Sequence, residues 1–301
     1  MVVALTVAAF VAPMLAQVQP VFHADASLVT VPVLATDAHG NAVRDLKPEE
    51  FRLYDNGAPR EIGQVWLEEE LPLVIGIVVD ISASQRAFLR EHRTTVDGFL
   101  AKLLRPGDRA FVVAVNEKVV LQSEFVGRPS GIGEIALARG GEPLGEPCPT
   151  LKGQRICGGT TLWDAVYQTA HLELSRFKGR GALLILSDGI DTGSIHHLDQ
   201  ALDEVNRVGA LAYTIRYPDP LSGLGGDGLL RLATETGGAY FEPPTGDYAA
   251  VLDRIQRDLR SQYVLGFRPE PDGNSKHLLR VEVVRPGVLI RARRQYFLPP
   301  E

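Results

Sequence analysis

The chain has few cysteines, no excess of positive charge and few long apolar runs, and each of these absences argues against a class of protein. Only two cysteines occur among 301 residues, so a zinc site built mainly of cysteine ligands cannot form. Lysine and arginine number 31 against 37 aspartates and glutamates. The resulting net charge of −6 argues against broad nucleic-acid binding, because neutralising phosphates requires a cationic surface. With 45% hydrophobic and 23% charged residues, the chain suits one large globular domain or two unequal ones.

The one long apolar run stands near the start of the sequence. Val2 to Ala16 carries no charged residue, is too short to span a bilayer comfortably and ends at a small residue. We therefore expect residues 1–16 to be a signal peptide and the protein to be exported to the periplasm, the cell surface or the medium. A buried N-terminal strand is the alternative. No comparable run follows, so we expect no membrane span in the mature chain.

The two cysteines fit an oxidising compartment. Cys148 and Cys157 flank a short loop that contains proline and glycine and lacks a clear period. A bridge between them would close a short ring and remove roughly 2–3 kcal/mol of freedom from the unfolded chain. We predict this disulfide, and two free thiols are the alternative if the protein stays in the cytosol.

The hydrophobic period changes twice along the chain and divides it into three segments after the expected signal peptide. Residues 17–68 alternate with a period of two and carry strong turn clusters, as in a small β segment. Residues 69–260 alternate buried strands with amphipathic helices. Residues 261–301 return to a period of two, and we expect this C-terminal β segment to pack with the N-terminal one.

The middle segment predicts an α/β fold. Its strand candidates are continuous apolar runs: Leu73–Val79, Ala110–Val115, Val119–Phe125, Ala182–Leu186, Ala210–Ile215 and Ala239–Phe241. Apolar residues at helical spacing mark helices between Phe88 and Leu103, between Leu162 and Leu174, and between Tyr248 and Leu259. Such alternation predicts a doubly wound, mainly parallel, Rossmann-like sheet with helices on both faces. The short gap between the second and third runs predicts a hairpin at a sheet edge. In the flanking segments, Leu28–Thr36, Phe51–Tyr54, Arg60–Leu67, Tyr263–Phe267, Leu279–Val284 and Val288–Phe297 are expected strands.

Oxygen-bearing side chains gather at the expected strand ends. Asp80 ends the first strand of the α/β segment, and Ser82 and Ser84 follow it in the loop before a helix. Thr160 follows two glycines ahead of another helix, and Asp188 follows a second apolar strand. Ligands of open parallel sheets gather beyond the carboxyl ends of strands. Two carboxylates and three hydroxyls suit a hard divalent cation such as Mg²⁺, Mn²⁺ or Ca²⁺, among which these residues do not choose, rather than zinc or copper.

This set of residues resembles a known site. In type and order, Asp80-x-Ser82-x-Ser84, Thr160 and Asp188 match the metal-ion-dependent adhesion site of the von Willebrand factor type A domain. The resemblance covers about residues 71–259. It implies that Ser82, Ser84 and in some states Thr160 touch Mg²⁺, while Asp80 and Asp188 hold it directly or through water.

The flanking segments resemble an exported bacterial group of related proteins, often acidobacterial. The motifs that carry this second resemblance are Val43–Phe51, Tyr263–Phe267 and Arg291–Tyr296, and they are less specific than the metal residues.

The expected function is non-enzymatic, metal-dependent protein binding, as in adhesion. Because hydroxyl ligands are neutral, a cation that they hold keeps its charge and an open coordination position. An aspartate or glutamate of a partner protein would fill that position. A structural or assembly protein without metal-dependent binding is one alternative.

A magnesium-dependent phosphoryl-transfer hydrolase of the haloacid-dehalogenase type is a second alternative, because such an enzyme also places an aspartate at a strand end. Its chemistry needs a second acid two residues later as proton donor, and Ser82 stands there. Dinucleotide binding by Gly223–Gly228, which fits G-x-G-x-x-G, is disfavoured because the motif does not emerge from a strand at the first βα turn. A loop near the rim of the metal site is the preferred interpretation of these glycines. The basic residues Arg291, Arg293 and Arg294 are expected on a solvated sheet face.

Overall fold

The computed structural model describes residues 28–68, 71–126, 150–151, 154–155, 159–177, 179–217, 225–243, 247–270 and 272–298. The expected signal peptide (1–16) and the expected bridge between Cys148 and Cys157 lie outside these residues. Within the described ranges, no helix combines the length and the apolar character that a membrane crossing requires.

The apolar runs of the middle segment form one six-stranded sheet. Its strands are β5 (Leu73–Asp80), β6 (Arg109–Val115), β7 (Val119–Val126), β10 (Arg180–Ser187), β11 (Leu211–Arg216) and β12 (Ala239–Phe241). They lie in the order β12-β11-β10-β5-β6-β7, and all neighbours are parallel except β6 and β7, an antiparallel hairpin at one edge. Every residue of β5 and β11 is buried, as expected for strands covered on both faces. The doubly wound sheet predicted from the sequence is confirmed.

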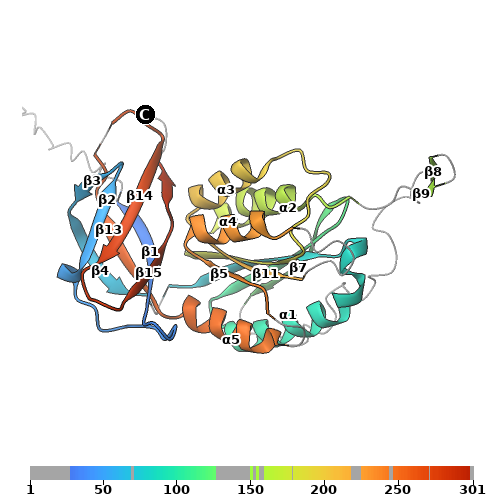
Figure 1. Cartoon of the computed structure of the whole chain (residues 1–301), viewed down its shortest axis with the longest axis horizontal. Helices are drawn as coiled ribbons and strands as arrows, with labels where there is room; N and C mark the ends of the chain where they lie inside the picture. Colours follow the sequence, from blue (N-terminus) through green and yellow to red (C-terminus); the bar gives the residue numbers. More distant parts are fainter. Residues whose placement is uncertain are drawn as a thin grey trace, which may run out of the picture.

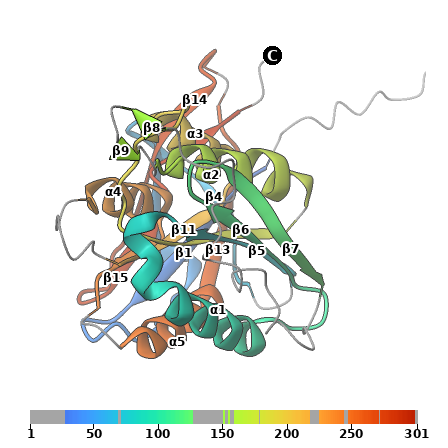
Figure 2. The ribbon, with the colours of Figure 1, turned by 90° about the vertical axis from the view of Figure 1, so that its right-hand side faces the viewer.

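Helices cover both faces of this sheet. The α-helices of the described chain are α1 (Leu89–Leu103), α2 (Leu162–Gln168), α3 (Leu198–Arg207), α4 (Asp227–Thr236) and α5 (Tyr248–Leu259). Helices α1 and α5 pack on one face, and α2, α3 and α4 pack on the other (Figures 1 and 2). We call the part from β5 to α5 the α/β unit. The sequence predictions did not include α3, although Leu198, Leu202 and Val205 stand at helical spacing.

The helix expected between Leu162 and Leu174 is regular only as far as Gln168. A π-helical turn (Thr169–Glu173) and a 3₁₀ turn (Leu174–Arg176) follow. The Thr169 hydroxyl donates a hydrogen bond to the carbonyl oxygen of Ala165 at 2.6 Å, a contact that bends helices. Gly76 of β5 lies directly beneath, and a Cβ there would come within 2.7 Å of the Thr169 methyl group.

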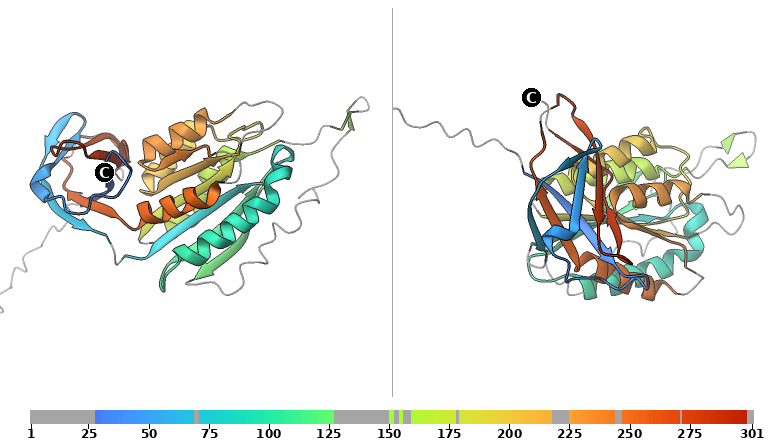
Figure 3. Two further views of the ribbon diagram at one scale, coloured as in Figure 1. Left: turned by 60° about the horizontal axis from the view of Figure 1, so that its bottom comes forward. Right: turned by 60° about the vertical axis from the view of Figure 1, so that its left-hand side comes forward.

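The segments before and after the α/β unit together form a β unit of two sheets (Figures 1 and 3). Its strands are β1 (Val29–Thr36), β2 (Phe51–Asp55), β3 (Ala58–Arg60), β4 (Ile62–Leu67), β13 (Gln262–Phe267), β14 (Lys276–Val283), β15 (Leu289–Ala292) and β16 (Gln295–Phe297). One sheet has the order β15-β1-β13-β4 and the other β16-β14-β2-β3. Each sheet takes strands from both ends of the chain, and their inner faces share one apolar core. The domain limits 17–68, 69–260 and 261–301 stay predictions. A separate pair of two-residue strands, β8 (Thr150–Leu151) and β9 (Gln154–Arg155), completes the described elements.

Two strands expected to be continuous are each divided, because the chain changes sheets within them. In Arg60–Leu67, β3 ends at Arg60 and pairs with β2, whereas β4 begins at Ile62 and pairs with β13 of the other sheet. In Val288–Phe297, β15 pairs with β1 and β16 pairs with β14, with the change at Arg293 and Arg294.

The expectation of a solvated basic face was wrong for two of the three arginines. At the change of sheets the chain faces the α/β unit, and Arg293 is only 7% exposed. Arg291 forms an ion pair with Asp258 of α5 and donates to the carbonyl oxygen of Gly238 at 3.0 Å. These two side chains therefore join the β unit to the α/β unit.

Candidate metal centre

Asp80 ends β5 at the point where the order of the parallel strands reverses. After β5 the chain continues to β6 on one side, whereas β10, β11 and β12 lie on the other. Open parallel sheets bind ligands outside the carboxyl ends of strands at such a reversal. Asp188 follows the last residue of β10, the strand hydrogen-bonded beside β5, so the sheet brings the two aspartates to the same edge. The side chain of Asp80 is fully buried, and Asp188 is 1% exposed.

The loop after β5 turns two hydroxyls toward these carboxylates. The backbone N–H of Ser82 donates to Asp80 Oδ1 at 2.9 Å. The Ser82 and Ser84 hydroxyl oxygens lie 3.1 Å apart, and the Ser84 hydroxyl donates to Asp188 Oδ2 at 2.6 Å. Asp80, Ser82, Ser84 and Asp188, which are up to 108 positions apart in the sequence (188 − 80), therefore form one contiguous polar cluster.

Sequence reasoning missed two polar residues of the cluster. The Ser187 hydroxyl donates to Asp80 Oδ2 at 2.6 Å and accepts from the N–H of Gly189 at 3.0 Å. Gln85 Nε2 donates to Asp188 Oδ2 and to the carbonyl oxygen of Tyr217, each at 3.1 Å. Ser187 ends β10 one residue before Asp188, and its position at a strand end was the available indication. Nothing in the local sequence distinguishes Gln85 from any other buried glutamine.

The cluster holds negative charge that the described protein does not balance. Burial raises the pKa of Asp80 to about 6 by penalising its charged form, and the nearby Asp188 adds to the rise. Hydrogen bonds from Ser187 and Ser82 act in the opposite direction, because they stabilise the carboxylate. Among the described residues, neither aspartate makes an ion pair with lysine, arginine or histidine. Two neighbouring buried carboxylates without a counter-charge are costly unless a cation joins them.

Thr160 lies in the loop before α2 and is 7% exposed. Its backbone N–H donates to the Thr192 hydroxyl at 2.9 Å, and its carbonyl oxygen accepts the N–H groups of Thr192 and Gly193. These bonds tie the Thr160 loop to the loop that carries Asp188. The structure thus connects Thr160 to the cluster through the backbone, and its hydroxyl makes no hydrogen bond to the other four residues in the described structure.

Two further loop features border the cluster. Gly225 has a φ of +90°, and a Cβ there would lie 2.3 Å from the carbonyl oxygen of Asp188. The second half of the glycine-rich segment therefore lies against the metal-site loop. Asp191 accepts hydrogen bonds from the N–H of Trp163 at 3.3 Å and from the Ser194 hydroxyl at 2.5 Å. It thereby anchors the loop to α2.

The donor set fits a hard cation. Carboxylate and hydroxyl oxygens are the ligands that Mg²⁺, Mn²⁺ and Ca²⁺ prefer, and the neutral hydroxyls leave the two aspartates as the only charges of the set. In the ranges that the structure describes, no three His, Cys, Asp or Glu side chains group to hold a metal ion. A metal at this edge would therefore depend on the serine and threonine hydroxyls as well as on the acids.

The resemblance to the von Willebrand factor type A domain implied a doubly wound, mainly parallel sheet, and the structure has one. No protein-family model matches the chain, and no curated protein sequence matches it.

Several solved structures are similar to this one at low sequence identity. A von Willebrand factor type A protein from Catenulispora acidiphila is 12% identical, with 82% of this chain and 73% of that one covered and a TM-score of 0.47. The ArnB paralog VWA2 from Sulfolobus acidocaldarius is 10% identical, with 91% and 77% covered and a TM-score of 0.44. Proximal thread matrix protein 1 from the mussel byssus, described with a zinc-occupied MIDAS motif, is 15% identical, with 68% and 49% covered and a TM-score of 0.48. This chain spans about half the length of the mussel protein. At these values the likenesses concern the fold, and the functional argument depends on the residues themselves.

Proposed function

We propose that this protein is a non-enzymatic, divalent-metal-dependent protein-binding module. Asp80, Ser82, Ser84, Thr160 and Asp188 would hold Mg²⁺, with Mn²⁺ or Ca²⁺ as possible substitutes. The observation that supports the proposal most is the pair of buried aspartates that each accept a hydrogen bond from a serine hydroxyl and have no counter-charge in the described protein. Such a pair is expected where a cation completes the site.

The partner in this proposal is a protein that presents an aspartate or glutamate. A bound dication would supply positive charge for that carboxylate. The serine hydroxyls add no negative charge of their own, so they leave more of the metal charge for the incoming acid. Ser187 and Gln85 hold Asp80 and Asp188 in place by hydrogen bonds and so keep the carboxylates oriented before a partner arrives.

The first test titrates the folded protein with MgCl₂ and with MnCl₂ and measures the heat of binding by isothermal titration calorimetry. We expect saturable binding to the wild type and none to Asp188→Ala. Asp253→Asn is a matched control, because this aspartate is exposed on α5 and pairs only with Lys102 in the described structure. The absence of metal binding to folded wild-type protein would refute the proposal.

A second test addresses the partner. Proteins from the exported fraction are captured on the immobilised wild type with Mg²⁺ present and again with EDTA. We expect a protein that the wild type and Asp253→Asn both retain in Mg²⁺. The same protein should be lost when EDTA is present or when Asp188→Ala is immobilised instead. Retention that is equal with and without EDTA would favour the alternative of an assembly protein without metal-dependent binding.

The hydrolase alternative is tested with a chromogenic phosphate ester. Ser82 stands where that chemistry requires a proton-donating acid, and in the structure its hydroxyl oxygen lies beside that of Ser84. We expect no turnover above the buffer rate with Mg²⁺ present. Turnover that disappears in Asp80→Asn would favour the hydrolase.

Export belongs to the same proposal. The apolar run Val2–Ala16 and the cysteines Cys148 and Cys157 support a periplasmic, surface or secreted location with a disulfide. A thiol assay on unreduced protein recovered from outside the cytoplasm is expected to find no free thiol. Two reactive thiols would refute the bridge.

A further inference from the structure

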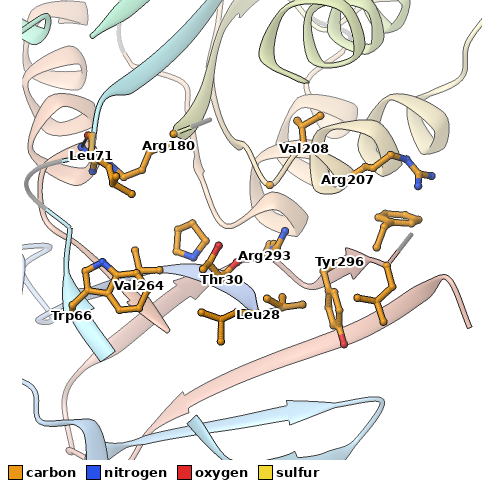
Figure 4. A pocket seen from close by; sticks show the side chains of 16 residues that line it. Leu28, Thr30, Trp66, Leu71, Arg180, Arg207, Val208, Val264, Arg293 and Tyr296 are labelled. Atoms are coloured by element: carbon orange, nitrogen blue, oxygen red, sulfur yellow. Dashed lines mark hydrogen bonds between the residues drawn. The ribbon is translucent and has the colours of Figure 1, made fainter. Parts of the chain in front are cut away.

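A cavity lies where the β unit meets the α/β unit, at the end of the sheet opposite the metal centre. Its volume is about 330 Å³, within the range of small-molecule sites, and Figure 4 shows its side chains. Arg180, the first residue of β10, lines it, whereas Ser187 at the other end of β10 contacts Asp80. The two residues are the ends of an eight-residue extended strand, which places them about 23 Å apart. The cavity and the metal centre are therefore distinct sites.

Every charged side chain that lines the cavity is basic. Arg180, Arg207 and Arg293 contribute to its wall, and no aspartate or glutamate of the described residues does. Arg207 is half exposed, pairs with Glu204 and lies over the ring of Phe297. The other two arginines are more than nine-tenths buried. The cavity is therefore a positively charged space inside a protein whose net charge is −6.

Arg293 is the side chain that most lacks a counter-charge. Its guanidinium donates to the carbonyl oxygens of Asn206 at 3.2 Å and Thr30 at 2.7 Å, and it makes no ion pair in the described structure. Its Nε has no hydrogen-bond partner there. Burial lowers the pKa of Arg293 to about 10, so the side chain stays charged at neutral pH. A buried cation that meets carbonyl oxygens and the ring of Tyr296 but no acid is costly by itself, and an anion in the cavity would offset that cost.

Arg180, which also lines the cavity, makes similar contacts. It donates to the carbonyl oxygens of Leu259 at 2.7 Å and Leu71 at 3.4 Å, and its Nε is also without a hydrogen-bond partner in the described protein. The closest acids act on it only at a distance. Asp108 is engaged in an ion pair with Arg260, and Glu68 accepts from Trp66 Nε1 and from the Leu71 N–H.

The remainder of the wall is largely apolar. Leu28, Val264, Trp66 and the ring of Tyr296 face the cavity from the β unit, below Arg293 in Figure 4. A bare inorganic ion would leave this apolar surface without a contact, whereas a molecule with a charged head and an apolar body would cover it. The combination of fixed cationic donors and apolar walls is typical of sites that take small amphipathic anions.

We infer that this cavity binds a small amphipathic organic anion, with a carboxylate or phosphate monoester head at Arg293 and an apolar body against Val264 and Leu28. Arginine suits both head groups, because its planar donors form paired hydrogen bonds with two oxygens. The site does not depend on the metal centre, and its ligand is expected to bind in the presence of EDTA.

The test uses three probes of equal chain length on the full protein in EDTA. Calorimetry compares hexanoate, hexyl phosphate and the neutral 1-hexanol. We expect at least one of the two anions to bind at least tenfold more tightly than hexanol, and the tighter one identifies the head group. Arg293→Met is expected to weaken that anion at least tenfold. Arg280→Met, which removes an exposed arginine of β14 that does not line the cavity, is expected to bind it as the wild type does.

Two results would overturn the inference. One is equal binding of hexanol and both anions, which would make the cavity a purely apolar site. The other is no binding of either anion up to about 5 mM, weaker than a cavity of this kind should achieve. If Arg293→Met does not fold, the comparison of the anions with hexanol on the wild type decides by itself.

Discussion

Two aspartates are buried to the same degree in the two units, but their surroundings are opposite. Asp55 of the β unit is 1% exposed, and its Oδ1 lies 3.0 Å from Nδ1 of the buried His277. Its Oδ2 lies 3.6 Å from Arg60 Nε, so the carboxylate has a basic group on each side. Asp80 of the α/β unit is 0% exposed and meets only hydroxyl and N–H donors in the described structure.

This difference distinguishes a carboxylate that is paired with basic side chains of the protein from one that remains available to a ligand. The protein balances Asp55 itself, and we interpret the Asp55–His277 pair as part of the structure of the β unit. It leaves Asp80 and its neighbour Asp188 without positive charge. The same reasoning applies with the opposite sign to Arg293, a buried cation with no acid beside it. Uncompensated buried charge therefore marks both places where we expect a ligand.

The largest effect is expected from Asp55→Ala. Removing this carboxylate takes the nearest acid from the buried His277, which keeps only Asp272 at 3.5 Å, whereas Arg60 keeps Glu270 at 2.6 Å. The free energy of unfolding should therefore fall by about 3 kcal/mol. Urea denaturation with and without MgCl₂ measures it. The metal-induced gain in stability should be the same as in the wild type. A loss below about 1 kcal/mol would contradict the structural role of this pair.

Asp80→Asn should have the opposite effects: it should abolish the metal-induced gain in stability and leave the stability in EDTA undiminished. Wild-type protein in Mg²⁺ at 100 times its Kd should gain about 2.7 kcal/mol of stability, and the variant should gain none. In EDTA the variant should be at least as stable as the wild type, because the substitution removes a buried charge without a counter-charge. The same denaturation experiment decides. A loss in EDTA as large as that of Asp55→Ala would make Asp80 a structural residue.

His92 of α1 allows a pH test of the α/β unit. It is fully buried beside Phe88 and Tyr217, and burial lowers its pKa from 6.5 to about 3. The unfolded chain therefore binds the proton more readily, so stability is present above pH 6.5 and is lost as the pH falls toward 3. Between pH 6.5 and pH 5 the loss attributable to this group should be about 2 kcal/mol.

The measurement compares urea denaturation at these two pH values for wild type, His92→Phe and a control, His39→Phe. His39 lies on an exposed turn of the β unit. The raised pKa of Asp80 makes stability rise as the pH falls over the same range, so only the difference between variants isolates His92. We expect the change in stability between pH 6.5 and pH 5 to be less unfavourable in His92→Phe than in the wild type by about 2 kcal/mol, and the control to match the wild type. An unaltered slope in His92→Phe would show that another group causes it.

The smallest effect is expected for an exposed pair. Lys102 and Asp253 join α1 to α5 at 2.9 Å, but their side chains are 60% and 44% exposed. Water and salt screen such a pair, so Lys102→Met should change the free energy of unfolding by about 0.5 kcal/mol or less. Denaturation at low and high salt checks this. A change above about 1 kcal/mol would show that exposure does not decide the worth of a charge pair in this protein.

Much of the fold could be predicted because burial leaves a local pattern in the sequence. Strands covered on both faces need unbroken apolar runs, and the runs that predicted β5 and β10 lie where the structure has these strands. The divided strands could not be predicted. The breaks after Arg60 and at Arg293 depend on which sheet each half joins, and a local run of residues contains no information about a distant partner.

The candidate site was predictable to a similar extent. Asp80 and Asp188 were expected at strand ends, and the structure brings them together with Ser82 and Ser84. Their roles as metal ligands, and that of Thr160, stay predictions. Ser187 was missed because its hydroxyl reaches Asp80 only through the pairing of β5 with β10.

The sequence by itself determined where the fully buried strands of the α/β unit lie and that Asp80, Ser82 and Ser84 stand at the end of one of them, since these properties depend on neighbours within a few residues. Only the tertiary structure decided which charges are balanced. It placed a histidine and an arginine beside the Asp55 carboxylate, left the Asp80 carboxylate without an ion pair in the described protein, and put Arg293 inside rather than on the surface. The physical reason is that the energy of a buried charge depends on groups that come near it only after the chain has folded.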